Sequence, residues 1–270
     1  TARTFIVRAP KDLVRGTGEV PVVIAMHGGG GNAENAEMMT GFTKLVERER
    51  LIAVYPDGSG RRGDKLLTWN AGHCCGYAME QQVDEAAFVN AILDWLVARY
   101  PVDQRRIYLT GMSNGAMVSH RLGRELSHRV AAIAPVVGAV FGDEPAAKGP
   151  VNAIIFNGLL DSSVRPDGGL GDGLGRRAWD GTPPKPNLAQ GEYWAKQNGC
   201  DATPVRAETA KVIHWRWACP TGRAVELYQV KDNGHAWPGG KAGSRRGDGP
   251  SQSLDATEVM WEFFKAHPKR

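Results

Sequence analysis

The sequence predicts a single α/β domain, residues 1–270, with a mostly parallel central sheet covered by helices on both faces. Three observations support this fold class. Short β-branched apolar runs alternate with amphipathic runs along the whole chain, as strands and helices do around a parallel sheet. A chain of 270 residues can bury one large core. We find neither an internal repeat nor a linker between two parts of the sequence.

The first half of the chain is expected to supply three buried strands and two helices. The strands are VPVVIAMHG (20–28), LIAVYPDG (51–58) and RRIYLTG (105–111), which are compact, apolar and ended by turn residues. The first helix is expected within residues 32–50. The second, within 82–100, carries the strongest signal: Asp84 can cap it, Pro101 ends it, and one face carries Phe88, Ile92, Trp95 and Leu96.

The second half continues the alternation and contains two long irregular loops. Helices are expected within 114–128, 187–199 and 254–267, and strands within 130–140, 151–158, 214–219 and 224–237. The Gly/Pro-rich segments 164–187 and 238–253 interrupt this rhythm. Loops of this length in compact domains usually serve function, so we expect both on the side of the active site.

Composition excludes several classes of function. The formal charge is only +4, the arginines are scattered pairs, and no nucleic-acid-binding motif accompanies them. No apolar run approaches the ~20 residues needed to span a bilayer. The first residues, TARTFIVRAPKD, lack the basic and apolar regions of a signal peptide. We therefore expect no nucleic-acid partner and no membrane segment, and we expect a monomer.

The four cysteines favour disulfides over a metal site. Cys74 and Cys75 are adjacent and Cys200 and Cys219 are 19 residues apart, so neither pair has the C-x2-C spacing of a metal site. The even count suits an oxidising compartment. Cys200–Cys219 is the preferred pair because it closes a local loop. Cys74 and Cys75 are then either a vicinal bridge or two free thiols.

Ser113 stands in a Gly-x-Ser-x-Gly motif, GMSNG (111–115), at the end of one predicted strand and the start of a helix. Sites in parallel sheets form at the carboxyl ends of strands. Gly111 and Gly115 lack Cβ atoms, which allows the sharp turn that exposes a nucleophilic serine. The motif alone is a weak signal, but this strand–turn–helix context makes Ser113 the candidate nucleophile.

A serine nucleophile needs a base, and His235 is the candidate among seven histidines. It follows the last predicted strand in DNGHAW, and in this architecture the base comes last in the order serine, acid, histidine. His73, in a loop rich in Gly and Cys, is the rival.

The acid should follow the strand before the last one. Asp161, three residues after Gly158, fits this position and could orient the imidazole of His235. Asp143 is the alternative, and Asp167 and Asp172 lie deeper in the loop.

The predicted oxyanion hole combines the backbone N–H of Asn114 with one from the loop MHGGGGN (26–32). Glycines in that loop let amides approach a developing oxyanion closely. Gly29 is the preferred second donor and Gly30 the alternative. A phosphate-binding loop is excluded because no Gly-Lys-Ser/Thr follows.

Six segments together resemble the secreted poly(3-hydroxybutyrate) depolymerase/feruloyl esterase family, the LpqC-like esterases of the α/β-hydrolase superfamily. They are HGGGGN (27–32), WNAGHCCG (69–76), VDEAAFV (83–89), YLTGMSNGAM (108–117), NGC (198–200) and NGHAWPGG (233–240). The resemblance implies a Ser113–Asp161–His235 triad, a secreted protein whose signal peptide has been removed, and ester substrates from short acyl esters to feruloylated polysaccharides. It also supports the Cys200–Cys219 pair. One departure is Asn157, where similar proteins carry histidine; it puts the local loop in doubt.

The expected activity is hydrolysis of carboxylic esters through an acyl-enzyme, without metal or organic cofactor. Trp237, Trp69 and Trp179 are the candidate substrate-binding residues, because they lie near the catalytic histidine or in loops. The alternative substrate is a hydroxyalkanoate oligomer. A non-catalytic carbohydrate-binding module on the same fold and a serine peptidase remain as distant alternatives.

Overall fold

The computed structural model describes residues 3–14, 16, 18–61, 63, 65–171, 178–243 and 247–270. In this part of the chain, nine strands form one sheet in the order β1-β3-β2-β4-β5-β6-β9-β8-β7. The six central strands are parallel, and they are β3 (Ile52–Pro56), β2 (Val20–Met26), β4 (Val102–Met112), β5 (Ala132–Val136), β6 (Asn152–Gly158) and β9 (Val225–Val230). The predicted parallel sheet is therefore confirmed.

Antiparallel strands extend the sheet at both edges. β1 (Phe5–Arg8) pairs with β3, and β8 (Val212–Trp217) pairs with both β9 and β7 (Val205–Glu208). The strand expected within 214–219 thus lies between two antiparallel neighbours, β7 and β9. β1 and β7 were not expected, because β7 is exposed along its whole length and β1 is only half buried. Neither strand has the compact apolar run by which buried strands are recognised.

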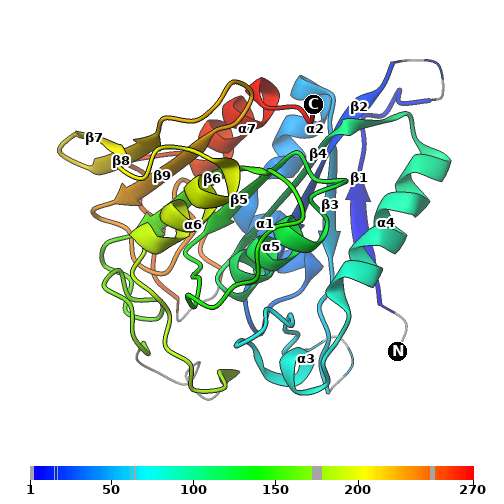
Figure 1. Ribbon diagram of the computed structural model, residues 1–270. Helices are drawn as coiled ribbons and strands as arrows, with labels where there is room; N and C mark the ends of the chain where they lie inside the picture. Colours follow the sequence, from blue (N-terminus) through cyan, green and yellow to red (C-terminus); the bar gives the residue numbers. More distant parts are fainter. Residues whose placement is uncertain are drawn as a thin grey trace.

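Helices cover both faces of the sheet (Figure 1). One face carries α4 (Glu85–Arg99), α5 (Asn114–Glu125) and α6 (Leu188–Asn198), and the other carries α1 (Ala33–Thr40), α2 (Leu45–Glu49) and α7 (Ala256–Ala266). The helix expected within 32–50 is interrupted at Gly41, which adopts φ 71° and is followed by a 3-10 turn, η1 (Phe42–Lys44). A short unexpected helix, α3 (Gly76–Glu80), precedes α4.

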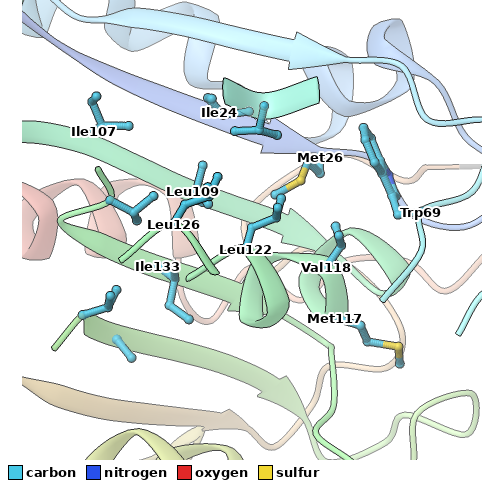
Figure 2. Packing of buried hydrophobic residues seen from close by; sticks show 14 of the residues in the cluster. Ile24, Met26, Trp69, Ile107, Leu109, Met117, Val118, Leu122, Leu126 and Ile133 are labelled. Atoms are coloured by element: carbon cyan, nitrogen blue, oxygen red, sulfur yellow. The ribbon is translucent and has the colours of Figure 1, made fainter. Parts of the chain in front are cut away.

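The larger core lies between the sheet and α4, α5 and α6 (Figure 2). Ile24, Leu109 and Ile133 from three adjacent parallel strands meet Val118 and Leu122 of α5, and all five are fully buried. Burying one such side chain contributes about 1.5–3 kcal/mol. This packing fixes α5, whose first residue follows Ser113, against the carboxyl end of the sheet.

Candidate active site

Ser113 occupies a strained turn between β4 and α5. Its backbone has φ 57° and ψ −119°, a conformation that non-glycine residues rarely adopt. The turn requires glycine on either side, because a Cβ at Gly111 would collide with the backbone of Gly115 and a Cβ at Gly115 with the backbone of Met26. The strand–turn–helix context predicted for the motif is therefore present, and it holds the serine hydroxyl above the sheet.

Ser113, His235 and Asp161 come together from three separate segments. Nε2 of His235 lies 2.9 Å from Oγ of Ser113, and its Nδ1 lies 2.7 Å from Oδ2 of Asp161. The side chain of Asp161 is 1 % exposed, so its carboxylate is desolvated against the imidazole. The three side chains therefore have the hydrogen-bonded arrangement predicted for them, and a relay of this kind can make a serine nucleophilic.

Backbone groups fix both partners of this relay. Oδ1 of Asp161 accepts hydrogen bonds from the N–H groups of Ser163 and Val164, each at 2.8 Å. The turn that carries His235 is shaped by the buried Asn233, whose Nδ2 donates to the carbonyls of Gly234 and Ala236. The carboxylate and the imidazole are therefore held in place before any substrate arrives.

The rival residues lie elsewhere. His73 is bonded to Asp143 and Asp180 and does not contact Ser113. Asp143, the alternative acid, is thereby assigned to a different histidine. Asp167 is exposed and paired with Arg165. Asp172 lies outside the described residues.

The two candidates for the second oxyanion donor differ in their hydrogen bonds. The N–H of Gly30 donates to the carbonyl of Leu67 at 2.8 Å, so it is already engaged. Among the described residues, no acceptor faces the N–H of Gly29. A Cβ built on Gly29 would lie 3.8 Å from Cβ of Asn114, which places Gly29 next to the first residue of α5. The geometry favours Gly29 and Asn114 as the pair of donors.

His27 is a positioning residue that the sequence reasoning missed. It is fully buried; its Nδ1 donates to the carbonyl of Gly28 at 2.7 Å and its Nε2 accepts from the N–H of Gly58 at 2.9 Å. Burial lowers the pKa of His27 to about 4, so the ring is neutral at neutral pH. It therefore ties the glycine loop to the end of β3 without bringing a charge near the predicted oxyanion hole.

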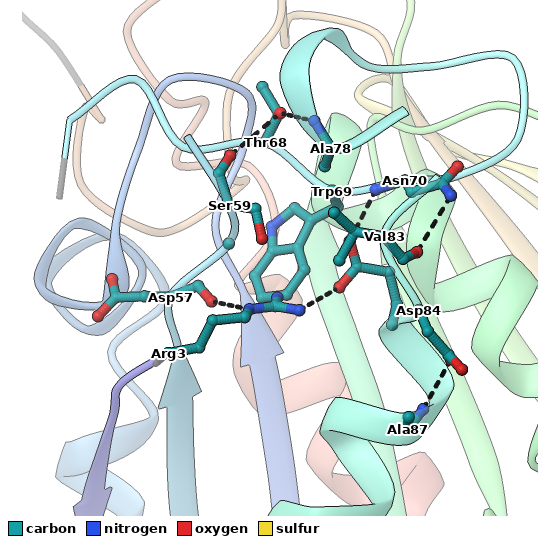
Figure 3. Close-up of polar contacts among 12 residues, drawn as sticks. Arg3, Asp57, Ser59, Thr68, Trp69, Asn70, Ala78, Val83, Asp84 and Ala87 are labelled. Carbon is teal, nitrogen blue, oxygen red and sulfur yellow. Dashed lines mark hydrogen bonds and ion pairs between the residues drawn. The ribbon is translucent and has the colours of Figure 1, made fainter. Parts of the chain in front are cut away.

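The side chain of Asn114 has a second role that its motif did not reveal. Its Oδ1 accepts from the backbone N–H of Trp69 at 2.7 Å, and its Nδ2 donates to the carbonyl of Trp69 at 3.0 Å. Trp69 is fully buried, and Figure 3 shows it among polar contacts with Arg3 beside it. Arg3 in turn pairs with the buried Glu85 at 2.8 Å. This network anchors the loop that precedes α3 to the start of α5.

Two adjoining pockets open on either side of Ser113 and His235. One has a volume of about 630 Å³ and is lined by the glycine loop, Asn35, Lys65 and Asp248. The other has a volume of about 420 Å³ and is lined by Met117, Val164, Leu170 and Trp179, with Cys74 and Cys75. Both pockets expose more apolar than polar surface, but the described residues of the first include Lys65 and Asp248, whereas those of the second include no Asp, Glu, Lys or Arg; we call the second the apolar pocket.

Of the three tryptophans that were expected to bind substrate, one lines a pocket and two are buried in the core. Trp179 lines the apolar pocket, as expected. Trp69 and Trp237 have no exposed surface, so the expectation that they line the site is not met. Trp69 packs on His27 with ring centroids 5.0 Å apart, and the indole N–H of Trp237 bonds Thr257. Both support the loops from within the core.

The cysteines form two bridges, Cys200–Cys219 and Cys74–Cys75. The preferred pair across residues 200–219 is therefore present, and the adjacent pair is bridged rather than free.

The departure at Asn157 is accommodated by Gln190. Its Nε2 donates to Oδ1 of Asn157 at 3.2 Å, and its Oε1 faces His120 at 2.9 Å. A polar chain thus occupies the position where similar proteins carry histidine.

Within the described residues, we find no group of three or more His, Cys, Asp or Glu side chains that could hold a metal ion. None of the helices described here combines the length and apolarity that crossing a membrane requires.

Comparison with known proteins identifies relatives that share parts of this chain. The chain is 28 % identical over 160 residues to a bifunctional acetylxylan esterase/xylanase of Neocallimastix patriciarum, covering 59 % of this chain and 21 % of that protein. It is 25 % identical to poly(3-hydroxyalkanoate) depolymerase C of Paucimonas lemoignei, covering 81 % of this chain and 55 % of that protein. It is 23 % identical to a probable feruloyl esterase C of Aspergillus niger, covering 91 % of this chain and 77 % of that protein. The chain thus spans about a fifth of the length of the Neocallimastix protein and about half of the length of the Paucimonas protein.

A solved structure supports the fold, and a family model gives the membership. Acetyl xylan esterase from Aspergillus awamori superposes with a TM-score of 0.62 at 14 % identity, covering 98 % of this chain and 95 % of that one. The family model described as esterase PHB depolymerase matches residues 13–164, which is more than half of the 270 residues. The protein described here therefore belongs to the esterase PHB depolymerase family.

Proposed function

We propose that this protein is a serine hydrolase of carboxylic esters that acts through an acyl-enzyme. The observation that carries this proposal is the position of His235, whose two ring nitrogens face Oγ of Ser113 at 2.9 Å and the buried carboxylate of Asp161 at 2.7 Å. Family membership supports the same chemistry. No cofactor is part of the proposal.

The proposed reaction has two steps that use the same groups. His235 takes the proton of Ser113 as the serine attacks the ester carbonyl, and the N–H groups of Gly29 and Asn114 hold the negative oxygen. His235 then gives the proton to the leaving alcohol. Water, deprotonated by His235, attacks the acyl-enzyme and releases the acid. Asp161 stabilises the imidazolium in both steps.

The two pockets support a division of the substrate. The apolar pocket that contains Trp179 suits an acyl group, from acetyl to an aromatic acyl such as feruloyl. The pocket with Asn35, Lys65 and Asp248 offers hydrogen-bonding groups for the alcohol, which in a plant cell-wall ester is a sugar. A hydroxyalkanoate oligomer is the alternative substrate, supported by the relative from Paucimonas lemoignei.

The first test compares the wild type with Ser113→Ala on p-nitrophenyl acetate and butyrate. We expect kcat to fall by several orders of magnitude in the folded variant, since the nucleophile is absent. Equal rates in the two proteins would contradict the proposal. Methyl ferulate and a hydroxybutyrate oligomer, tested next on the wild type, distinguish the two substrate classes.

A further inference from the structure

A second histidine cluster joins three loops beside the apolar pocket. Nδ1 of His73 lies 2.7 Å from Oδ2 of Asp180, and its Nε2 lies 2.8 Å from Oδ2 of Asp143. The three residues come from the loop before α3, the segment after β5 and the segment after β6. None of them lines either of the pockets next to Ser113. The proposed mechanism leaves this cluster without a role.

The geometry of the His73 cluster (His73, Asp143 and Asp180) requires a protonated ring. A neutral imidazole has one N–H and can donate to only one carboxylate, while its other nitrogen would direct a lone pair at the second. With both nitrogens facing ionised oxygens, two hydrogen bonds form only in the imidazolium. Partial burial lowers the pKa of His73, but the hydrogen bonds to Asp180 and Asp143 outweigh it and hold this pKa above its ordinary value.

The cluster is directly connected to Trp179, the aromatic wall of the apolar pocket. Trp179 precedes Asp180 and forms an antiparallel bridge with Cys74, the residue after His73. The N–H of Asp180 donates to the carbonyl of His73 at 3.1 Å. Phe141 completes the connection. Its ring centroid lies 4.9 Å from that of His73 in a tilted arrangement and 5.9 Å from that of Trp179 in an edge-to-face arrangement.

Two other charged residues on these segments, Glu144 and Lys185, form no ion pair or side-chain hydrogen bond with the His73 cluster in the described part of the chain. Glu144, next to Asp143, accepts hydrogen bonds from the backbone N–H groups of Phe141 and Gly142. Lys185, on the segment of Asp180, lies against Gly142, and its N–H donates to the carbonyl of Val140 at 2.9 Å. Within the described residues, the charges that meet the His73 ring are therefore the two carboxylates.

We infer that the imidazolium of His73, held between Asp143 and Asp180, positions Trp179 against the apolar pocket and thereby sets the preference for bulky acyl groups. This inference rests on the proposed esterase function. When His73 loses its proton, one hydrogen bond becomes a repulsion, and Trp179 is held less firmly, by the backbone contacts alone. An acetyl group fills little of this pocket of about 420 Å³, so we expect its hydrolysis to depend much less on Trp179.

The test is the ratio of kcat/KM for p-nitrophenyl ferulate to that for p-nitrophenyl acetate, measured between pH 5.5 and 9. Both esters share a leaving group, so the ionisation of the triad cancels in the ratio. The extra stability from His73 is present below its unfolded pKa and is lost as pH rises through the raised folded value. We expect the ratio to fall about threefold to tenfold over this rise, mainly through KM for the ferulate.

Three variants separate positioning from a merely structural role. In Asp143→Asn the carboxamide can donate to a neutral Nε2, so both hydrogen bonds persist without the ring charge and the ratio should stay high at every pH. His73→Gln removes the bridge, and Trp179→Ala removes the wall. Both should give a low ratio that does not change with pH.

A pH-independent ratio in the wild type, or an unchanged pH dependence in Asp143→Asn, would overturn the inference while leaving the esterase proposal intact. If the protein hydrolyses neither ester, the proposed function fails, and nitrogen-15 NMR still tests the cluster. The indole N–H of Trp179, assigned with Trp179→Phe, should then shift as His73 titrates in the wild type and not in Asp143→Asn. An indole signal that stays constant over that pH range would also overturn it.

Discussion

At the scale of single residues, the glycine loop distinguishes two neighbouring amides. The N–H of Gly30 is bonded to Leu67, whereas that of Gly29, a residue that lines both pockets beside Ser113, has no acceptor among the described residues. Gly29 also lies outside the left-handed region, since its φ is not positive. The contribution of this one N–H can therefore be measured by removing it.

Gly29→Pro and Gly29→Ala form a matched pair for that measurement. Proline has no N–H, so we expect kcat on p-nitrophenyl acetate to fall about 10²–10³-fold, as for other single oxyanion donors. Alanine keeps the N–H, and its Cβ would meet Asn114 at an ordinary 3.8 Å, so kcat should stay within about tenfold of the wild type. Urea unfolding of both variants serves as the control for folding. Equal losses of kcat in the two would argue against Gly29 as a donor.

The side chain of Asn114 should matter for stability as well as rate. Asn114→Ala leaves the buried N–H of Trp69 without a partner and removes one of the two hydrogen bonds that the Trp69 carbonyl accepts, at a cost of about 1–3 kcal/mol in the free energy of unfolding. Denaturant unfolding measures this cost. Met117→Leu, a volume-conserving change at a buried position of the same helix, is the control, and it should cost less than about 1.5 kcal/mol.

The structure brings together the three residues that the sequence predicted to meet, because a motif and a topology agree there. Ser113, Asp161 and His235 each follow a strand of the parallel sheet, so chain order alone placed them together. The supporting residues could not be found this way. His27 and Asn114 act through buried contacts with Gly58 and Trp69, and these contacts depend on how distant loops pack. Trp69 and Trp237 were misjudged because a loop position says nothing of burial.

At the scale of elements, the Cys200–Cys219 bridge ties the end of α6 to the end of β8. It closes a loop of sequence separation 19, and neither cysteine lines the pockets beside Ser113. Replacing both by serine should lower the free energy of unfolding by about 3 kcal/mol, mostly by relaxing the unfolded chain. Urea unfolding checks this, and kcat on p-nitrophenyl acetate should remain within twofold. A large loss of kcat in the folded variant would show that the hairpin supports the site.

Elements were predictable in proportion to their burial. The central strands have compact apolar sequences, and α4 has both the cap at Asp84 and a buried stripe, so their positions followed from the pattern. β1 and β7 owe their strand conformation to pairing with a neighbour already in place. Gly41 interrupts α1 because its left-handed conformation ends the helix, a choice that a helical pattern of apolar residues does not reveal.

At the scale of the whole molecule, three histidines give stability a maximum near neutral pH. His27 and His120 are buried and uncharged; burial lowers the pKa of His27 to about 4 and that of His120 to about 3. The unfolded chain binds protons at these positions near pH 6.5 whereas the folded chain does not, so stability falls as pH falls below that value. His73 acts in the opposite direction, and its contribution is lost as pH rises through its raised pKa.

The acid side of this maximum gives a measurable slope. The cost of each buried histidine should approach about 1.4 kcal/mol per pH unit as pH falls below 6.5, so together they remove about 4–5 kcal/mol by pH 4.5, where most carboxylates are still ionised. Urea unfolding at several pH values measures the slope. His120→Asn, although less stable at pH 7.5 because Gln190 and Trp194 lose a partner, should show about 1.4 kcal/mol less loss per pH unit than the wild type. Identical slopes in the two proteins would mean that His120 binds its proton in the folded state, and the neutral core that positions the site would then have to tolerate a charge.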